Sequence, residues 1–147
     1  MKILMVCLGN ICRSPLAHGI MEAMAKEKGL DWEVESAGTG NWHVGEPPDR
    51  RSIAVARAHG IDISRQVCRL FSISDFDTYD HIFVMDRSNL SDILAQARNR
   101  EDEEKVRLLL GDKVVPDPYY HNALFEPVFK LVEKGCKDII EELTASN

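Results

Sequence analysis

The segment KILMVCLGNICRSP, residues 2–15, decides the fold of this chain. It begins with a short, almost continuous apolar run, residues 2–7, which is typical of a strand covered on both faces of a sheet. A Gly-Asn pair interrupts the run. Ser14 followed by Pro15 then indicates a helix start, because serine can cap a helix and proline suits the first helical position. A buried strand that leads directly into a helix is the opening unit of a parallel α/β sheet.

The rest of the chain continues this alternation of strand and helix patterns. Strands and helices are expected, in chain order, at residues 2–7, 14–29, 32–36, 50–59, 81–85, 88–98, 106–110 and 124–143. The alternation predicts the α/β class: a three-layer, doubly wound, four-stranded parallel sheet of flavodoxin-like form, with helices on both faces. In such a fold the ligand site lies beyond the carboxyl ends of the strands. We therefore expect the chemistry in the loop that follows the first strand.

The composition limits the kind of protein. The chain has 147 residues, 44% hydrophobic and 29% charged, so we expect a single domain over residues 1–147 rather than a disordered or fibrous chain. A net charge of −6 makes a poor general binder of nucleic acid. The sequence offers neither the apolar run of a membrane helix nor the cysteine density of a disulfide scaffold. We expect a cytoplasmic protein with reduced thiols and no nucleic-acid or membrane partner.

The loop after the first strand has the features of an anion site. Backbone N–H groups in such a turn point inward, and the N-terminus of the following helix adds positive potential. Arg13 can hold a tetrahedral oxyanion through two parallel hydrogen bonds. We therefore assign phosphate binding to Leu8, Gly9, Asn10, Ile11, Cys12, Arg13 and Ser14.

Cys7 is expected at the base of this loop. The loop dipoles, Arg13 and the Ser14 hydroxyl would stabilise a thiolate, and a thiolate that faces a bound phosphoryl group is aligned for attack. The sequence lacks the G-x-x-x-x-G-K-[ST] motif of a nucleotide loop, the C-x-x-C of a thioredoxin pair and the second ligand pair of a zinc site. No metal or organic cofactor is expected, because side chains and backbone N–H groups fill every role.

A second loop contains the motif PDPYY, residues 116–120. Asp117 is a candidate general acid, because a phosphate ester cannot release its alcohol or phenol without a proton. The alternative is that Asp117 only forms a turn by bonding its own backbone. Tyr119, and Trp42 in the Gly- and Pro-rich segment 37–49, are expected beside the anion site, where aromatic side chains suit an aryl phosphate.

These motifs resemble the low-molecular-weight protein tyrosine phosphatases over essentially the whole chain. The similarity rests on C-L-G-N-I-C-R-S just after an N-terminal strand, together with D-P-Y-Y near the C-terminal end. Further matches are S-A-G-T at 36–39, P-P-D at 47–49, H-G-I at 59–61 and M-D-x-S-N-L at 85–90. The resemblance implies hydrolysis of phosphotyrosine and small aryl phosphates through a cysteinyl-phosphate on Cys7. Arg13 would bind the phosphate, and Asp117 would act as general acid and then as general base.

The same resemblance implies roles for the surrounding residues. The substrate pocket is implied to be lined by Ile11, Trp42 and Tyr119. The shape of the loop is implied to be supported by Asn10, Ser14, Ser36 and His59. Cys12 is implied to form a reversible disulfide with Cys7 on oxidation, which would make the enzyme redox-regulated. The implied partners are phosphotyrosine proteins, a bacterial tyrosine kinase among them.

Three other functions stay open on the sequence. Protein arginine phosphatases share the loop, but they typically have threonine where this chain has Ile11. Thioredoxin-coupled arsenate reductases need a further cysteine pair after the third strand, and residues 86–113 contain no cysteine. A non-catalytic phosphotyrosine-binding module would lack the nucleophile or the acid, whereas Cys7 and Asp117 are both present.

Overall fold

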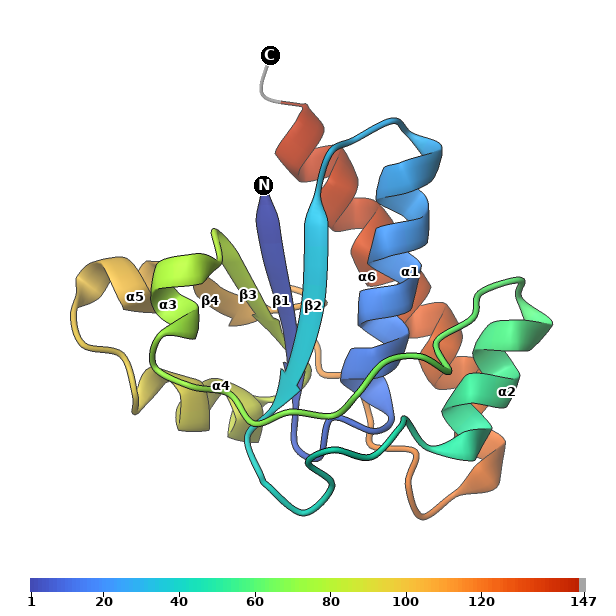
Figure 1. Cartoon of the computed structure of the whole chain (residues 1–147). Helices are drawn as coiled ribbons and strands as arrows, with labels where there is room; N and C mark the ends of the chain where they lie inside the picture. Colours follow the sequence, from blue (N-terminus) through green and yellow to red (C-terminus); the bar gives the residue numbers. More distant parts are fainter. Residues whose placement is uncertain (146–147) are drawn as a thin grey trace.

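The protein is built around a parallel sheet of four strands, in the order β2-β1-β3-β4 (Figure 1). The computed structural model describes residues 1–145, so the last two residues of the expected domain lie outside the described residues. The strands are β1 (Lys2–Cys7), β2 (Glu33–Gly38), β3 (His81–Val84) and β4 (Val106–Leu108). The expected doubly wound α/β sheet is confirmed.

Helices cover both faces of this sheet (Figure 1). They are α1 (Arg13–Glu27), α2 (Arg50–Ala58), α3 (Asp75–Thr78), α4 (Arg87–Leu94), α5 (Arg100–Glu104), the 3-10 turn η1 (Asn122–Leu124) and α6 (Phe125–Thr144). Helices α1 and α6 pack on one face, with α2 against them, and α3 and α4 pack on the other. Within residues 1–145, no helix is both long enough and apolar enough to cross a membrane.

The central strand β1 explains why the molecule has two cores. Ile3, Met5 and Cys7 belong to the core shared with α1 and α6, whereas Leu4 and Val6 belong to the core shared with α3 and α4. All five side chains are buried, as the continuous apolar run predicted. Cys7 shares the α1 side of the sheet with Ile3 and Met5. As the last residue of the strand, it lies at the carboxyl edge of the sheet.

Helix α1 begins at Arg13, and Ser14 does not cap it as expected. The N-cap residue is Cys12, which makes no side-chain capping hydrogen bond. The first N–H groups of a helix have no partner within the helix. An uncapped N-terminus therefore leaves these donors, and the positive end of the helix dipole, for an anion.

Helix α5 was not expected from the sequence, because its five residues show no apolar period. Polar contacts hold it in place. The Asn99 side chain caps it by accepting from the Asp102 N–H, and Asp102 is buried against the Arg98 guanidinium at 2.9 Å. A short helix of this kind depends on capping and ion pairing, which a search for hydrophobic periodicity does not detect.

Candidate active site

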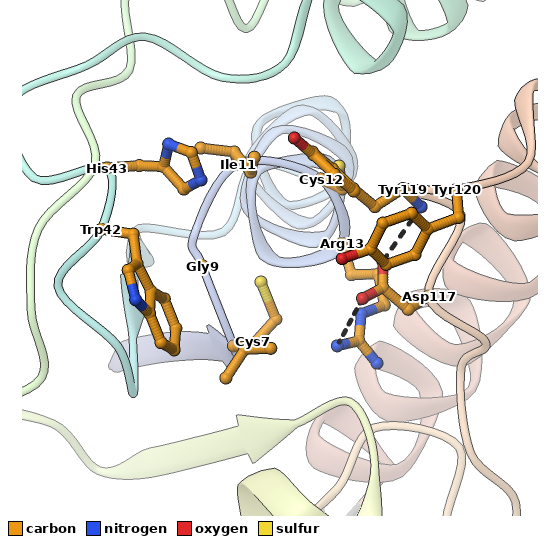
Figure 2. Close-up of a pocket in the computed structure, with 11 residues that line it drawn as sticks. Cys7, Gly9, Ile11, Cys12, Arg13, Trp42, His43, Asp117, Tyr119 and Tyr120 are labelled. Carbon is orange, nitrogen blue, oxygen red and sulfur yellow. Dashed lines mark hydrogen bonds and ion pairs between the residues drawn. The ribbon is translucent and has the colours of Figure 1, made fainter.

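A pocket of about 290 Å³ opens at the carboxyl edge of the sheet, where the loop from β1 to α1 lies. It is lined by Cys7, Leu8, Gly9, Ile11, Cys12, Arg13, Trp42, His43, Asp117, Tyr119 and Tyr120. Figure 2 shows the Cys7 sulfur in the space enclosed by the loop, with Trp42 on one side and Asp117 and Tyr119 on the other. The structure therefore brings both sequence-predicted loops together around one thiol.

The carbonyl groups of the loop are tied to neighbouring segments of the chain. The Cys7 carbonyl accepts from the Thr39 N–H at 3.0 Å, and the Leu8 carbonyl accepts from the Gly40 N–H at 2.9 Å. The Ile11 carbonyl accepts from the Asp49 N–H at 2.8 Å. In a trans peptide the C=O and the next N–H point in opposite directions. Each bond that holds a carbonyl outward therefore turns the following N–H inward.

The inward N–H groups have no protein partner. Among residues 1–145, no hydrogen bond is donated by the backbone N–H groups of residues 8–13. Groups of this kind, together with the N-terminus of α1, form a concave arrangement of donors that suits a phosphate. The hydrogen bonds from the surrounding chain thus hold the loop in a shape that suits phosphate.

Asn10 makes the turn of the loop possible. Its φ of 57° lies in the left-handed region, which asparagine tolerates better than most residues. Its side-chain Oδ1 accepts from the Arg69 N–H at 3.0 Å, and its Nδ2 donates to Ser14 Oγ at 2.8 Å. Gly38 allows the loop to approach β2, because a Cβ there would lie only 3.0 Å from the Leu8 carbonyl oxygen. Asn10 and Ser14 are buried and do not line the pocket, so they support the loop from behind.

Ser14 connects this support to the thiol. Its Oγ lies 3.0 Å from Cys7 Sγ. Because Asn10 already donates to the same oxygen, the Ser14 hydroxyl can donate its proton to the sulfur or, at 3.5 Å, to the Ala37 carbonyl. Asn10 and Ser14 thus place a hydroxyl directly beside the Cys7 sulfur.

Arg13 is the buried cation of the site, with only 3% of its surface exposed. Its Nη1 donates to Asp86 Oδ2 at 2.6 Å and to the Val115 carbonyl at 2.9 Å. Burial by itself would lower the pKa of Arg13, but the negative charges of Cys7, Asp86 and Asp117 outweigh it and raise the pKa overall. The guanidinium is therefore charged and held from behind at the edge of the pocket.

Asp117 lies on the pocket wall with 41% of its side chain exposed. Its Oδ2 is 4.0 Å from Arg13 Nη2, and its Oδ1 accepts from the Tyr119 N–H at 3.0 Å. One carboxylate oxygen of Asp117 therefore stabilises the turn, as the alternative reading expected, and the other lies near Arg13. Its role as general acid stays a prediction.

Aromatic rings form the mouth of the pocket. The Trp42 ring packs on Gly40, where an added Cβ would lie 1.9 Å from the indole Cζ3. Opposite, Tyr119 packs edge-on against Tyr120 at 4.9 Å and lies under the Arg51 guanidinium. The expected pocket residues Ile11, Trp42 and Tyr119 all line the pocket. His43 lines it too and was missed, because a single histidine in a loop carries no sequence signal.

Cys12 lines the same pocket as Cys7 but has a different environment. Burial, followed by the negative charges of Asp49 and Cys7, raises the pKa of the Cys12 thiol to about 12. Cys12 is therefore protonated near neutral pH, and a protonated thiol is a poor nucleophile. Within residues 1–145, no cluster of three metal-binding side chains is present.

The structure corrects the role expected for His59. Its Nε2 lies 2.7 Å from a Glu126 oxygen, and its ring stacks on Phe129 at 4.0 Å, so its side chain joins α2 to α6. Ser36, which was also expected to support the loop, contacts His18: the His18 Nδ1 lies 3.1 Å from Ser36 Oγ. Burial lowers the pKa of His18 to about 4. This neutral histidine on α1 was missed.

The fold and the loop together define an α/β protein with an oxyanion site built around a thiol. A family model described as Low molecular weight phosphotyrosine protein phosphatase matches residues 2–147. A protein-tyrosine-phosphatase of Bacillus subtilis, YfkJ, is 37% identical over 97% of this chain and 95% of its own. The chain therefore belongs to the low molecular weight phosphotyrosine protein phosphatase family. The expected enzyme class, a protein tyrosine phosphatase and thus a hydrolase, is confirmed at the level of the family.

Solved structures agree with this assignment. A protein tyrosine phosphatase from Entamoeba histolytica superimposes with a TM-score of 0.93 at 32% identity, covering 99% of this chain and 97% of the other. The Drosophila arginine phosphatase superimposes with a TM-score of 0.92 at 31% identity, covering 100% of both chains. The fold alone therefore does not separate phosphotyrosine from phosphoarginine.

Proposed function

We propose that residues 1–147 act as one domain that hydrolyses phosphotyrosine and small aryl phosphates through a cysteinyl-phosphate on Cys7. The observation that carries the proposal is the position of the Cys7 sulfur, which lies 3.0 Å from Ser14 Oγ in a pocket also lined by Arg13 and Asp117. A stabilised nucleophile, a cation and an acid thus surround one anion site.

In the first step the Cys7 thiolate attacks phosphorus. The S–P bond forms while the P–O bond to the tyrosine phenol breaks, and Asp117 gives its proton to the leaving oxygen. The N–H groups of residues 8–13 and the Arg13 guanidinium bind the equatorial oxygens, where charge is held in the transition state. In the second step water attacks phosphorus, Asp117 takes its proton, and the S–P bond breaks to release phosphate.

The aromatic mouth supports an aryl leaving group. A phenyl ring attached to the bound phosphate would lie between Trp42 and Tyr119, which line opposite walls of the pocket. Phosphoserine has no ring to place between these side chains. The proposed substrates are therefore phosphotyrosine proteins, with a bacterial tyrosine kinase as one partner class, because YfkJ is a bacterial tyrosine phosphatase. The free Cys7 thiol that the reaction requires fits the reducing cytoplasm.

Phosphoarginine is the second candidate substrate, because the Drosophila arginine phosphatase shares this fold. The decisive assay compares phosphotyrosine, phosphoserine and phosphoarginine peptides, without added metal, for wild type, Cys7→Ser and Asp117→Ala. We expect phosphotyrosine turnover that is lost in Cys7→Ser and falls by roughly 10²–10⁴-fold in Asp117→Ala, the usual range for losing a general acid. A preference for phosphoarginine would overturn the substrate assignment, and full activity of Cys7→Ser would overturn the mechanism.

The proposal includes reversible oxidation of the two thiols in the pocket. Peroxide oxidises the Cys7 thiolate to a sulfenic acid, and the Cys12 thiol then displaces water to form the Cys7–Cys12 disulfide. A dithiol restores both thiols and the activity. The test is recovery after peroxide: we expect Cys12→Ser to recover less activity than wild type, and equal recovery would contradict the redox role.

A further inference from the structure

Cys68 lies directly behind the phosphate loop, where it contacts two parts of the active site. It is 2% exposed, and its Sγ donates to the Asn10 carbonyl oxygen at 2.7 Å. Its backbone N–H donates to the Glu46 carbonyl at 2.8 Å, and its carbonyl accepts from Gly45 at 2.9 Å. Cys68 therefore joins the phosphate loop, through its thiol, to the segment that follows Trp42 and His43, through its backbone.

The segment around Cys68 is itself held firmly. The Gly38 N–H donates to the Arg69 carbonyl, and the Phe71 N–H donates to the Gly38 carbonyl, both at 2.8 Å. The Arg69 guanidinium pairs with Asp75, and a distance of 3.0 Å separates Nη1 from Oδ2. The thiol thus contacts the loop from a fixed support on the edge of β2.

The contact matters because of which carbonyl it holds. The Asn10 carbonyl belongs to the same planar peptide as the N–H of Ile11, a residue that lines the pocket. We propose that Cys68 is a positioning residue: its thiol holds the Asn10 carbonyl behind the loop and so keeps the Ile11 N–H directed at the phosphate. Backbone N–H groups hold the carbonyls of Cys7, Leu8 and Ile11, whereas the Asn10 carbonyl accepts from a side chain.

The protonation state of Cys68 suits this role. Burial, and then the negative charges of Cys7 and Glu46, raise the pKa of the Cys68 thiol to about 11. A protonated thiol has one hydrogen to donate, although it is a weak donor. Cys68 therefore remains a hydrogen-bond donor at neutral pH.

The test compares two substitutions of Cys68 with the same substitutions of Cys136. Cys68→Ala removes the donor and Cys68→Ser keeps one. Cys136 is also fully buried, but in the core between α1 and α6, so Cys136→Ala and Cys136→Ser control for the loss of a buried thiol. The probe is inorganic phosphate, measured by calorimetry and by the shift of the Ile11 amide resonance on binding. The thermal unfolding of each variant is recorded alongside.

We expect Cys68→Ala to bind phosphate roughly fivefold more weakly, as the loss of one modest hydrogen bond allows. Its Ile11 resonance should shift less on binding, and kcat/KM should fall by a similar factor. Cys68→Ser should bind within about twofold of wild type. The two Cys136 variants should bind phosphate as tightly as wild type, even if their unfolding temperature falls as much as that of the Cys68 variants.

Three results would overturn the proposal: unchanged phosphate affinity in Cys68→Ala, an equal loss in Cys68→Ser, or an equal loss in Cys136→Ala. The proposal rests on the proposed function for the role of the bound phosphate, but the phosphate measurement requires no turnover. If the wild-type protein binds phosphate but hydrolyses no substrate, the proposed function is contradicted. The phosphate affinities of the Cys68 variants then still decide the positioning role.

Discussion

Asp86 holds Arg13 with a single carboxylate oxygen, at 2.6 Å from the guanidinium Nη1, and uses its other oxygen to cap helix α4. The cap is a full capping box, because the Asn89 side chain also accepts from the Asp86 N–H. Asp86 is thus held in place by the helix that it caps. Through the bond to Asp86 the guanidinium of Arg13 is held in place too, although 73 residues separate the two in sequence.

Replacing Asp86 with asparagine should separate these two functions. Asparagine can still cap α4, but it removes the negative charge behind a buried guanidinium. We expect phosphate affinity to fall about tenfold and the free energy of unfolding to fall by about 1–3 kcal/mol. Asp77→Asn is the matched control, because Asp77 pairs with Arg98 at the same 2.6 Å on the surface. Phosphate inhibition and urea unfolding provide the measurements, and wild-type affinity in Asp86→Asn would contradict the role of Asp86.

Replacing Gly40 with alanine should displace the indole of Trp42. The added methyl group would occupy the place of the ring, with 1.9 Å between Cβ and Cζ3. We expect KM for aryl phosphates to rise roughly threefold, a loss typical of one aromatic contact, while inhibition by inorganic phosphate stays unchanged. The control is a double-mutant cycle: in a Trp42→Ala background the same change should have no further effect. An equal effect in both backgrounds would show that the backbone, not the ring, had moved.

Alkylation should distinguish the four thiols of the folded enzyme. Burial raises the pKa of Cys12 to about 12 and that of Cys68 to about 11, and it raises the pKa of Cys136 as well. We expect iodoacetamide at neutral pH to modify Cys7 alone, because their raised pKa values keep the other three thiols protonated and poorly reactive. Inorganic phosphate should slow this reaction. Mass spectrometry locates the label, urea-unfolded protein provides the fully labelled reference, and earlier labelling of Cys12 than of Cys7 would refute the assignment.

His18 should make the folded enzyme less stable in mild acid. Burial lowers its pKa to about 4, below the ordinary value of 6.5, so the unfolded chain binds a proton first as the pH falls. This contribution to stability is complete above about pH 6.5 and is lost progressively down to pH 4. Between pH 7 and pH 4 we expect wild type to lose about 3 kcal/mol more than His18→Gln does.

Urea unfolding at several pH values measures this difference. Glu22 Oε2 lies 3.7 Å from His18 Nε2 and would favour the charged ring, so Glu22→Gln should enlarge the effect. His121→Gln is the control, because His121 is exposed. Parallel pH curves for wild type and His18→Gln would show that His18 titrates normally.

The central strand, the first helix and the phosphate loop could be predicted from the sequence because their signals are local. Residues 2–15 contain the apolar run, the turn residues and the start of the helix within one short stretch. The catalytic candidates Cys7, Arg13 and Asp117 were predictable for a related reason, since each lies in a short motif whose residue types suit one chemistry.

The supporting contacts could not be predicted in the same way. The contact of His18 with Ser36 depends on how α1 packs on β2, and the contact of Cys68 with Asn10 depends on a segment without regular structure. His59 was expected near the loop, but α2 directs it to Glu126 on α6. Such pairs join distant parts of the chain, and a single sequence holds no periodic pattern that marks them.

The long-range contacts of Arg13 also affect when a newly made chain becomes an enzyme. A ribosome releases Cys7 and its loop first, whereas Asp86, Val115 and Asp117 emerge much later. Until then Arg13 has neither its carboxylate nor its carbonyl partner, and no acid faces the thiol. A chain made only as far as the first helix therefore contains the nucleophile without a working site, because the partners of Arg13 come from residues 86–117.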